Sequence, residues 1–120
     1  MSPTPDIANQ YARMQIATSA GPKIVCMLHQ RCVTLIQQSL SSTAPSRPVL
    51  DKAQNILAQL ERALNVNDDL SQSLFYLYDF CYCSLEKTDP GSHQFVSRIM
   101  ATLRDTFDQL FAPNRQEAKI

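Results

Sequence analysis

Proline and glycine divide this chain into blocks of helical length, and this division restricts the fold more than any other feature of the sequence. These two residues interrupt regular secondary structure more strongly than any others. Between them, apolar residues recur with the period of a helix, and no stretch shows the sustained alternation of a half-buried strand. The sequence therefore predicts an all-α protein. The dividing prolines are Pro22, Pro45, Pro48, Pro90 and Pro113.

Five helices are predicted from this division. Pro22 suits the first position of its helix, because the N–H that proline lacks would have no helical partner there. The fourth helix along the chain begins near Asp68 or Asp69, either of which can cap it by accepting hydrogen bonds from free backbone N–H groups. The other four helices are predicted at about residues 7–16, 22–40, 48–65 and 93–111.

Short loops join the four longer helices, and helices joined in this way pack as antiparallel neighbours. We therefore expect an antiparallel four-helix bundle with a short additional N-terminal helix laid against it. A chain of 120 residues fits one domain. Within that single domain, 1–120, residues 1–17 form an N-terminal segment and residues 113–120 a flexible tail.

The helical period also predicts which residues face the core. The third helix is cleanly amphipathic, with Asp51, Asn55, Gln59 and Arg62 on its outer side. The predicted inner faces are Ile24, Val25, Leu28, Cys32, Leu35 and Ile36 on the second helix, Val49, Ala53, Ile56, Leu57, Leu60 and Leu64 on the third, and Phe95, Val96, Ile99, Met100, Leu103, Phe107 and Leu110 on the fifth.

Composition narrows the classes of protein that remain. Eleven basic and eleven acidic residues cancel, so the chain lacks the basic character of most nucleic-acid-binding domains. The N-terminus has no signal-peptide pattern, and the apolar runs are too short to span a bilayer. We therefore expect a cytoplasmic protein with no membrane insertion. Zero net charge favours self-association, including a homodimer, when apolar surface is uncovered.

No pattern of metal-binding or catalytic residues is present. The four cysteines, Cys26, Cys32, Cys81 and Cys83, do not show the spacing of zinc sites. Reduced thiols that pack as small hydrophobic side chains explain them better. The chain also has no glycine-rich phosphate loop and no nucleophile elbow. We therefore predict no cofactor, no metal and no enzymatic activity.

The fourth helix carries more apolar surface than a bundle core needs. Tyr76, Phe80 and Cys83 cover the side opposite its inner stripe, which makes that side a candidate partner-binding surface. The alternative is that the N-terminal helix and the loops cover it. The second helix shows a milder excess, for which ordinary widening of the core stripe is the alternative. Its candidate partner-binding residues are Cys26, His29, Val33 and Leu40.

His29 suggests a second class of function. Histidine phosphotransfer modules are small four-helix domains that carry a solvent-exposed, phosphorylatable histidine on a helix. The residues after His29 are Gln30, Arg31 and Cys32, which differ from the usual pattern of those modules. His93, at the start of a helix, is predicted to be an ordinary surface residue.

Three segments resemble the flagellin-specific export chaperone family FliS. They are YARMQIATSAGPKIVCML from Tyr11, VLDKAQNILAQL from Val49 and SLFYLYDFCYCSLEKTD from Ser73. Their order and spacing over most of the chain carry the resemblance. The matching residues are Tyr11, Ile16, Thr18, Pro22, Met27, Leu28, Lys52, Ala53, Ile56, Leu60, Leu74, Leu77, Tyr78, Tyr82 and Leu85.

The resemblance implies a cytoplasmic helical bundle that binds the disordered C-terminal segment of flagellin, prevents premature polymerisation and delivers the client to the flagellar export platform. It also implies that Ile7, Tyr11 and Ile16 occupy the client groove when the client is absent. The chain departs from the family pattern at Ser19–Pro22 and at His29–Cys32. A divergent paralogue with another secreted client is therefore an alternative.

Overall fold

The computed structural model describes residues 21–64 and 69–119, with side chains for 21, 23–64 and 69–109. The described residues form four helices and no regular strand, which confirms the all-α prediction for this part of the chain. The predicted helix at 7–16 lies outside the described residues. The helices are α2 at Pro22–Leu40, α3 at Arg47–Ala63, α4 at Asp69–Glu86 and α5 at Pro90–Lys119.

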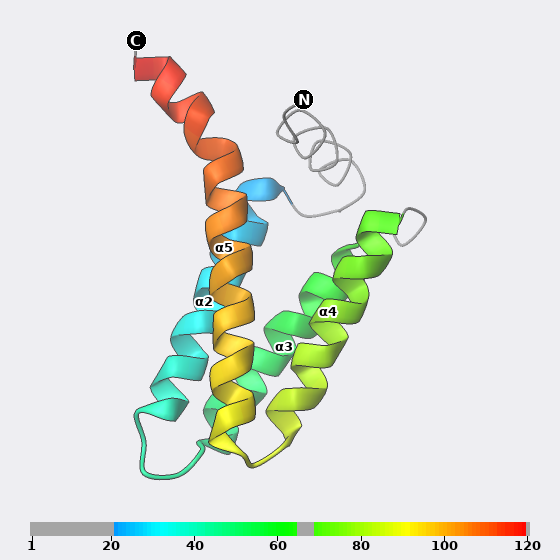
Figure 1. The fold of residues 1–120 in the computed structure, drawn as a ribbon, viewed down its shortest axis with the longest axis vertical. Helices are drawn as coiled ribbons and strands as arrows, with labels where there is room; N and C mark the ends of the chain where they lie inside the picture. The colour runs from blue at the N-terminus through cyan, green and yellow to red at the C-terminus, as the bar shows by residue number, and fades with distance from the viewer. Residues whose placement is uncertain (1–20, 65–68, 120) are drawn as a thin grey trace.

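The chain reverses direction at each connection between consecutive helices (Figure 1). Each helix packs mainly against two others, so that α2, α3, α4 and α5 follow one another around the bundle. The contact between α2 and α5 is the most extensive of the four, and the contact between α4 and α5 is the least extensive. The seam between α4 and α5 is therefore the side on which the core is least enclosed by neighbouring helices.

The last helix begins earlier and ends later than the sequence predicts. Asp89 caps it, because its Oδ1 accepts a hydrogen bond from the Gly91 backbone N at 3.1 Å and its Oδ2 accepts one from the Ser92 hydroxyl at 3.2 Å. These bonds favour the ionised form and lower the pKa of Asp89. Pro90 then takes the first helical position, where its missing N–H has no helical partner to lose. At the other end, α5 continues through Lys119 and includes most of the predicted tail.

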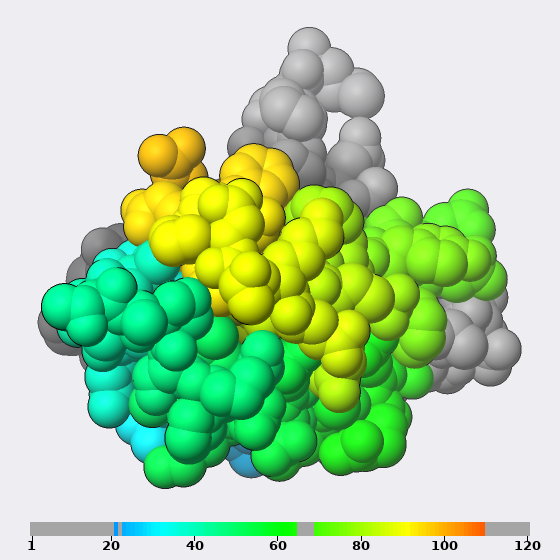
Figure 2. Space-filling view, turned by 90° about the horizontal axis from the view of Figure 1, so that it is seen from below, coloured from blue at the N-terminus to red at the C-terminus, as the bar shows by residue number. Residues whose placement is uncertain are grey.

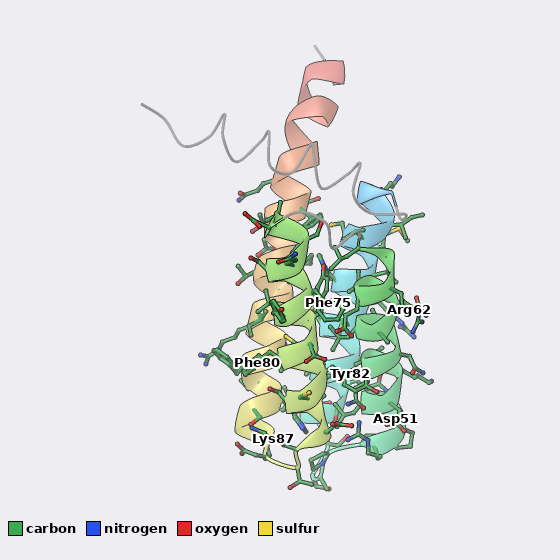
Figure 3. The ribbon with its side chains drawn as sticks, turned by 90° about the vertical axis from the view of Figure 1, so that its right-hand side faces the viewer. Asp51, Arg62, Phe75, Phe80, Tyr82 and Lys87 are labelled. Carbon is green, nitrogen blue, oxygen red and sulfur yellow. The ribbon has the colours of Figure 1, made fainter. Side chains whose placement is uncertain are left out.

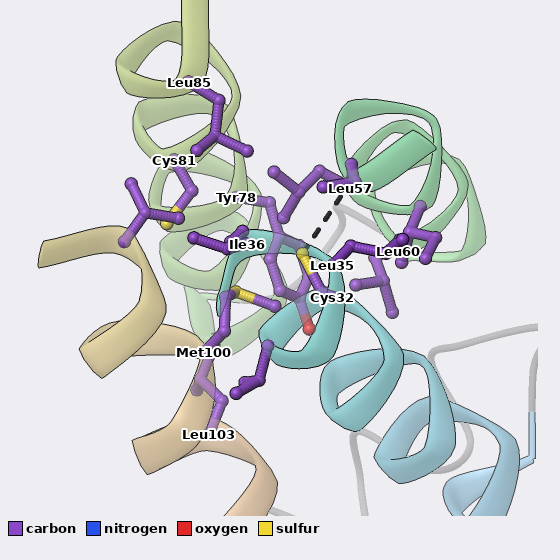
Figure 4. Packing of buried hydrophobic residues seen from close by; sticks show 14 of the residues in the cluster. Cys32, Leu35, Ile36, Leu57, Leu60, Tyr78, Cys81, Leu85, Met100 and Leu103 are labelled. Carbon is purple, nitrogen blue, oxygen red and sulfur yellow. Dashed lines mark hydrogen bonds between the residues drawn. The ribbon is translucent and has the colours of Figure 1, made fainter. Parts of the chain in front are cut away.

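One apolar core lies among the four helices, and Figure 4 shows its central side chains. Leu57 and Leu85 are completely enclosed, as are Tyr78 and Met100 to within 1% of their surface. Two assignments to the inner faces are wrong, since Ile24 is 55% exposed and Phe95 is 52% exposed. Both residues lie at the edge of an apolar stripe that is wider than the buried face.

Polar side chains tie α3 to the end of α4. Arg47 donates to the carbonyl of Leu85 at 3.0 Å and also to the side-chain oxygen of Gln54. Gln54, which is 6% exposed, donates in turn to the carbonyl of Tyr82 at 2.9 Å. The carbonyl of Leu85 belongs to the last turn of a helix, where intrahelical partners are missing. Arg47 therefore satisfies an acceptor that α4 cannot satisfy itself.

The end of the bundle that holds two of the connections is shown from below in Figure 2, where the α2–α3 connection lies beside the start of α5. A small pocket at this place is lined by Ser39, Pro45 and His93, among others. His93 is only 1% exposed, and its Nε2 lies 2.6 Å from the carbonyl oxygen of Lys87. The prediction of an ordinary surface histidine is therefore wrong, because His93 falls on the inner side of α5, one turn before Val96 and two turns before Met100.

Candidate functional site

The outer face of α4 is apolar although it faces solvent. Tyr76 is 68% exposed, Phe80 is 48% exposed, and Cys83 is also exposed. The three residues lie at i, i+4 and i+7, so they line one side of the helix over two turns. The structure thus places all three sequence-predicted residues of this helix at the surface. A large apolar side chain in such a position costs solvation free energy unless a partner covers it.

A residue of α5 extends this surface across the seam. The ring of Phe95 meets the ring of Phe80 edge to face, with centroids 6.1 Å apart and planes at 89°. In Figure 3, Phe80 lies on the α5 side of α4 whereas Tyr82 lies on the α3 side. We call Tyr76, Phe80 and Phe95 the aromatic strip. The exposure of Phe95 was not predicted, although a position five residues from the buried Met100 lies on another side of the helix.

Carboxylates border the strip on the α3 side. Asp79 and Glu86 are exposed on α4, and Glu61 of α3 lies close enough to Asp79 for their charges to interact. The pKa of the Cys83 thiol is raised, first by desolvation and then by the negative charges of Asp79, Glu86 and Glu61. We call Glu61, Asp79 and Glu86 the acidic edge. Cys83 therefore sits between an aromatic surface and a negatively charged one.

None of the four candidate partner-binding residues on α2 is exposed. His29 and Val33 are buried in the core, while Cys26 and Leu40 are only partly buried and pack against it. The physical reason is that Val25, His29, Cys32 and Ile36 repeat at helical spacing and together form the inner side of α2. The additional apolar residues predicted on this helix therefore widen its core-facing stripe. The exposed apolar residues of α2 are instead Ile24 and Met27, at 55% and 61% exposure.

His29 occupies the centre of the bundle. Its Nε2 shares a hydrogen bond of 2.8 Å with the hydroxyl of Tyr78, and its ring meets Phe107 edge to face at 4.9 Å. Burial lowers the pKa of His29 to about 4, because the charged form would be desolvated. The phosphotransfer alternative requires a solvent-exposed histidine, and His29 is 0% exposed, so that alternative is wrong.

Three further predicted residues, Ile7, Tyr11 and Ile16, lie outside the described residues. Within the described part of the chain, no group of three or more His, Cys, Asp or Glu side chains is arranged to hold a metal ion. The four cysteines form no disulfide bond with one another. None of the helices in that same part is both long enough and apolar enough to cross a membrane.

Comparisons with known proteins point to one family. The family described as "Flagellar protein FliS" matches residues 5–114. A similar protein from Bacillus subtilis (strain 168), "Flagellar secretion chaperone FliS", is 28% identical over 116 residues, which cover 89% of this chain and 87% of the relative. The match extends over all the elements described above except the last residues of α5.

Proposed function

The chain belongs to the FliS family of flagellar proteins, and from that premise we propose that it is a flagellar secretion chaperone for flagellin. In this proposal it acts in the cytoplasm, binds the disordered C-terminal segment of flagellin and keeps flagellin from polymerising before export. The complex then goes to the flagellar export platform. The activity is binding alone and involves no catalysis or cofactor.

The aromatic strip is the observation that carries this proposal. Phe80 and Phe95 contact each other across the seam, yet each keeps about half of its surface exposed. The seam between α4 and α5 is also the least extensive of the four contacts between neighbouring helices. An amphipathic segment that folds on binding buries its apolar side in such a surface. Tyr76, Phe80 and Cys83 are therefore the proposed contact residues on α4, with Phe95 added from α5.

Calorimetry with two forms of flagellin tests the client. We expect full-length flagellin to bind in a one-to-one complex and flagellin without its C-terminal segment to bind at least about tenfold more weakly, which corresponds to about 1.4 kcal/mol. Equal binding to both forms would contradict the proposed client segment. Binding to neither form would favour the alternative of a divergent paralogue with another secreted client.

We also propose that Ile7, Tyr11 and Ile16 form a lid that competes with the client for apolar surface. A tyrosine combines a large apolar area with a polar tip, which suits a contact that is sometimes covered and sometimes wet. If the lid is displaced, backbone amides around Tyr11 lose protection from hydrogen exchange when flagellin binds, while amides around Leu57 and Leu103 keep theirs. Greater protection around Tyr11 in the complex would make that segment part of the binding site instead.

A truncation complements the exchange experiment. Removal of the residues before Thr18 should leave the bundle helical by circular dichroism but expose the surface that the lid covers. Because the net charge of the whole chain is zero, little electrostatic repulsion opposes association of the uncovered surfaces. The truncated protein should therefore aggregate or dimerise more readily alone and less readily with flagellin. Unchanged association in the absence of flagellin would contradict the lid.

A further inference from the structure

The surface around the aromatic strip differs in charge between its two long sides. On the α3 side, Asp79 and Glu86 follow α4 at i and i+7, with the exposed Cys83 between them. Glu61 adds a third carboxylate from α3, because its charge interacts with that of Asp79. On the other side the strip continues onto α5 through Phe95, and one turn farther the exposed side chain is that of Arg98.

Cations near the acidic edge do not neutralise it fully. Arg62 and Lys87 lie close enough for their charges to act on Glu61 and on Cys83, respectively. Within the described part of the chain, however, the ion pairs are those of Arg47 with Asp51 and of Arg104 with Asp105. Neither pair involves a member of the acidic edge. At least one excess negative charge therefore remains beside the apolar surface.

We propose that this surface recognises a helical segment with basic residues along one flank of its apolar stripe, seated so that the apolar stripe covers the aromatic strip and the basic flank lies over the acidic edge. The proposal rests on the proposed chaperone function and adds the chemistry of the client segment. The i to i+7 extent of Tyr76 and Cys83 along α4 is about 10 Å, which matches two turns of a bound helix.

The charge asymmetry sets the orientation of the partner. With its apolar stripe on the aromatic strip, a helix could still lie in either of two opposite directions, because hydrophobic attraction is not directional. A basic flank lies over the acidic edge in only one of these directions, and the reverse direction would bring it toward Arg98 on α5. Complementary charge therefore supplies specificity and orientation, while the aromatic strip supplies most of the buried area.

Two synthetic peptides test this inference with the full-length protein. Both form helices and carry the same leucine stripe at i, i+3, i+4 and i+7; one has lysines along one flank of the stripe, and the other has glutamates there. Fluorescence anisotropy of labelled peptide measures the affinities at low and at physiological salt. We expect the lysine peptide to bind about tenfold more tightly at low salt, and this preference to shrink as salt screens the charges.

Matched variants locate the effect. Asp79→Asn with Glu86→Gln removes two negative charges from the acidic edge, and Asn55→Lys with Gln59→Lys adds two positive charges on the outer face of α3. Both double variants raise the net charge by the same amount. The first should bring the two peptides to within about twofold of each other, whereas the second should keep most of the wild-type preference. Phe80→Ser should weaken both peptides. Circular dichroism checks that each variant is folded.

Several outcomes would overturn the inference. They are equal affinity for the two peptides at low salt, no binding of either peptide, and a preference that survives Asp79→Asn with Glu86→Gln unchanged. Calorimetry with flagellin on the same samples separates this result from the proposed function. If flagellin binds through its C-terminal segment but the peptides are not distinguished, the client assignment stands and the charge recognition fails. If the peptides are distinguished but flagellin does not bind, the charge recognition stands and the client assignment fails.

Discussion

Helices α3 and α4 both bury apolar side chains on their inner sides, but their outer sides differ in polarity. Leu57 of α3 and Leu85 of α4 are each completely buried in the common core. On the outer side, α3 presents Gln59 and other polar residues to water, whereas α4 presents Tyr76 and Phe80. Core packing accounts for the apolar residues of α3, and its outer side is polar as water contact requires. Core packing leaves the outer face of α4 unexplained, and a surface that the fold does not require is where a binding function is to be sought.

The largest expected effect tests the buried inner sides that the two helices have in common. Leu57→Ala and Leu85→Ala should each lower the free energy of unfolding by about 2–5 kcal/mol, because each leaves a cavity in a core that cannot close completely. Urea unfolding followed by circular dichroism measures the change. Gln59→Ala on the outer side of α3 is the control and should stay within about 0.5 kcal/mol of the wild type. A small loss for Leu85→Ala alone would mean that α4 is not held by the core as α3 is.

The next effect, similar in size or smaller, is a loss of stability at acidic pH that arises from a buried contact of α4. Tyr78 of α4 bonds to His29, whose pKa burial lowers from 6.5 to about 4. The unfolded chain takes up a proton that the folded chain excludes, so stability is unaffected above pH 6.5 and falls as the pH drops toward 4. The full loss is about 3.5 kcal/mol, since one unit of pKa corresponds to about 1.4 kcal/mol.

The variant His29→Gln isolates this effect. It should be less stable than the wild type at pH 7, because a buried contact to Tyr78 is altered, but it has no imidazole at this position to protonate. Its loss of stability between pH 7 and pH 4.5 should therefore be smaller than that of the wild type by about 2 kcal/mol. Urea unfolding at the two pH values gives both numbers. An equal loss in the two proteins would show that His29 is accessible to protons in the folded state.

Much of the fold was predictable from the sequence because helical periodicity and chain breaks are local signals. Pro22 marks the start of α2 as expected. The start of α5 was missed by three residues, because the capping bonds of Asp89 to Gly91 and Ser92 place Pro90, rather than His93, at the first helical position. His93 also lines a pocket together with residues of the α2–α3 connection, and periodicity within one helix does not report contacts with such a distant segment.

The candidate site was predictable only in part. An apolar helix side that exceeds the need of the core can be counted from the sequence, which is why Tyr76, Phe80 and Cys83 were expected outside the core, where they lie. Their part in binding stays a prediction. Which side of a wide stripe faces inward is decided by the neighbouring helices, so His29 was wrongly placed outside the core and Phe95 wrongly placed within it. The pairing of Phe80 with Phe95 joins two helices and has no signature in either one alone.

The smallest expected effect compares two cysteines of α4 that differ only in the side on which they lie. Cys81 is completely buried and Cys83 is exposed, although only Tyr82 lies between them along the helix. Burial raises the pKa of Cys81 to about 12, so almost none of it is thiolate at pH 8. Iodoacetamide at pH 8 should modify Cys83 slowly in the folded protein and Cys81 only after denaturation, as peptide mass spectrometry can resolve.

Cys83→Ala should change stability by less than about 0.5 kcal/mol, whereas Cys81→Ala should cost more because it removes a buried sulfur. Equal labelling of the two thiols in the folded protein would mean that α4 rotates or opens, and the distinction between its inner and outer sides would fail.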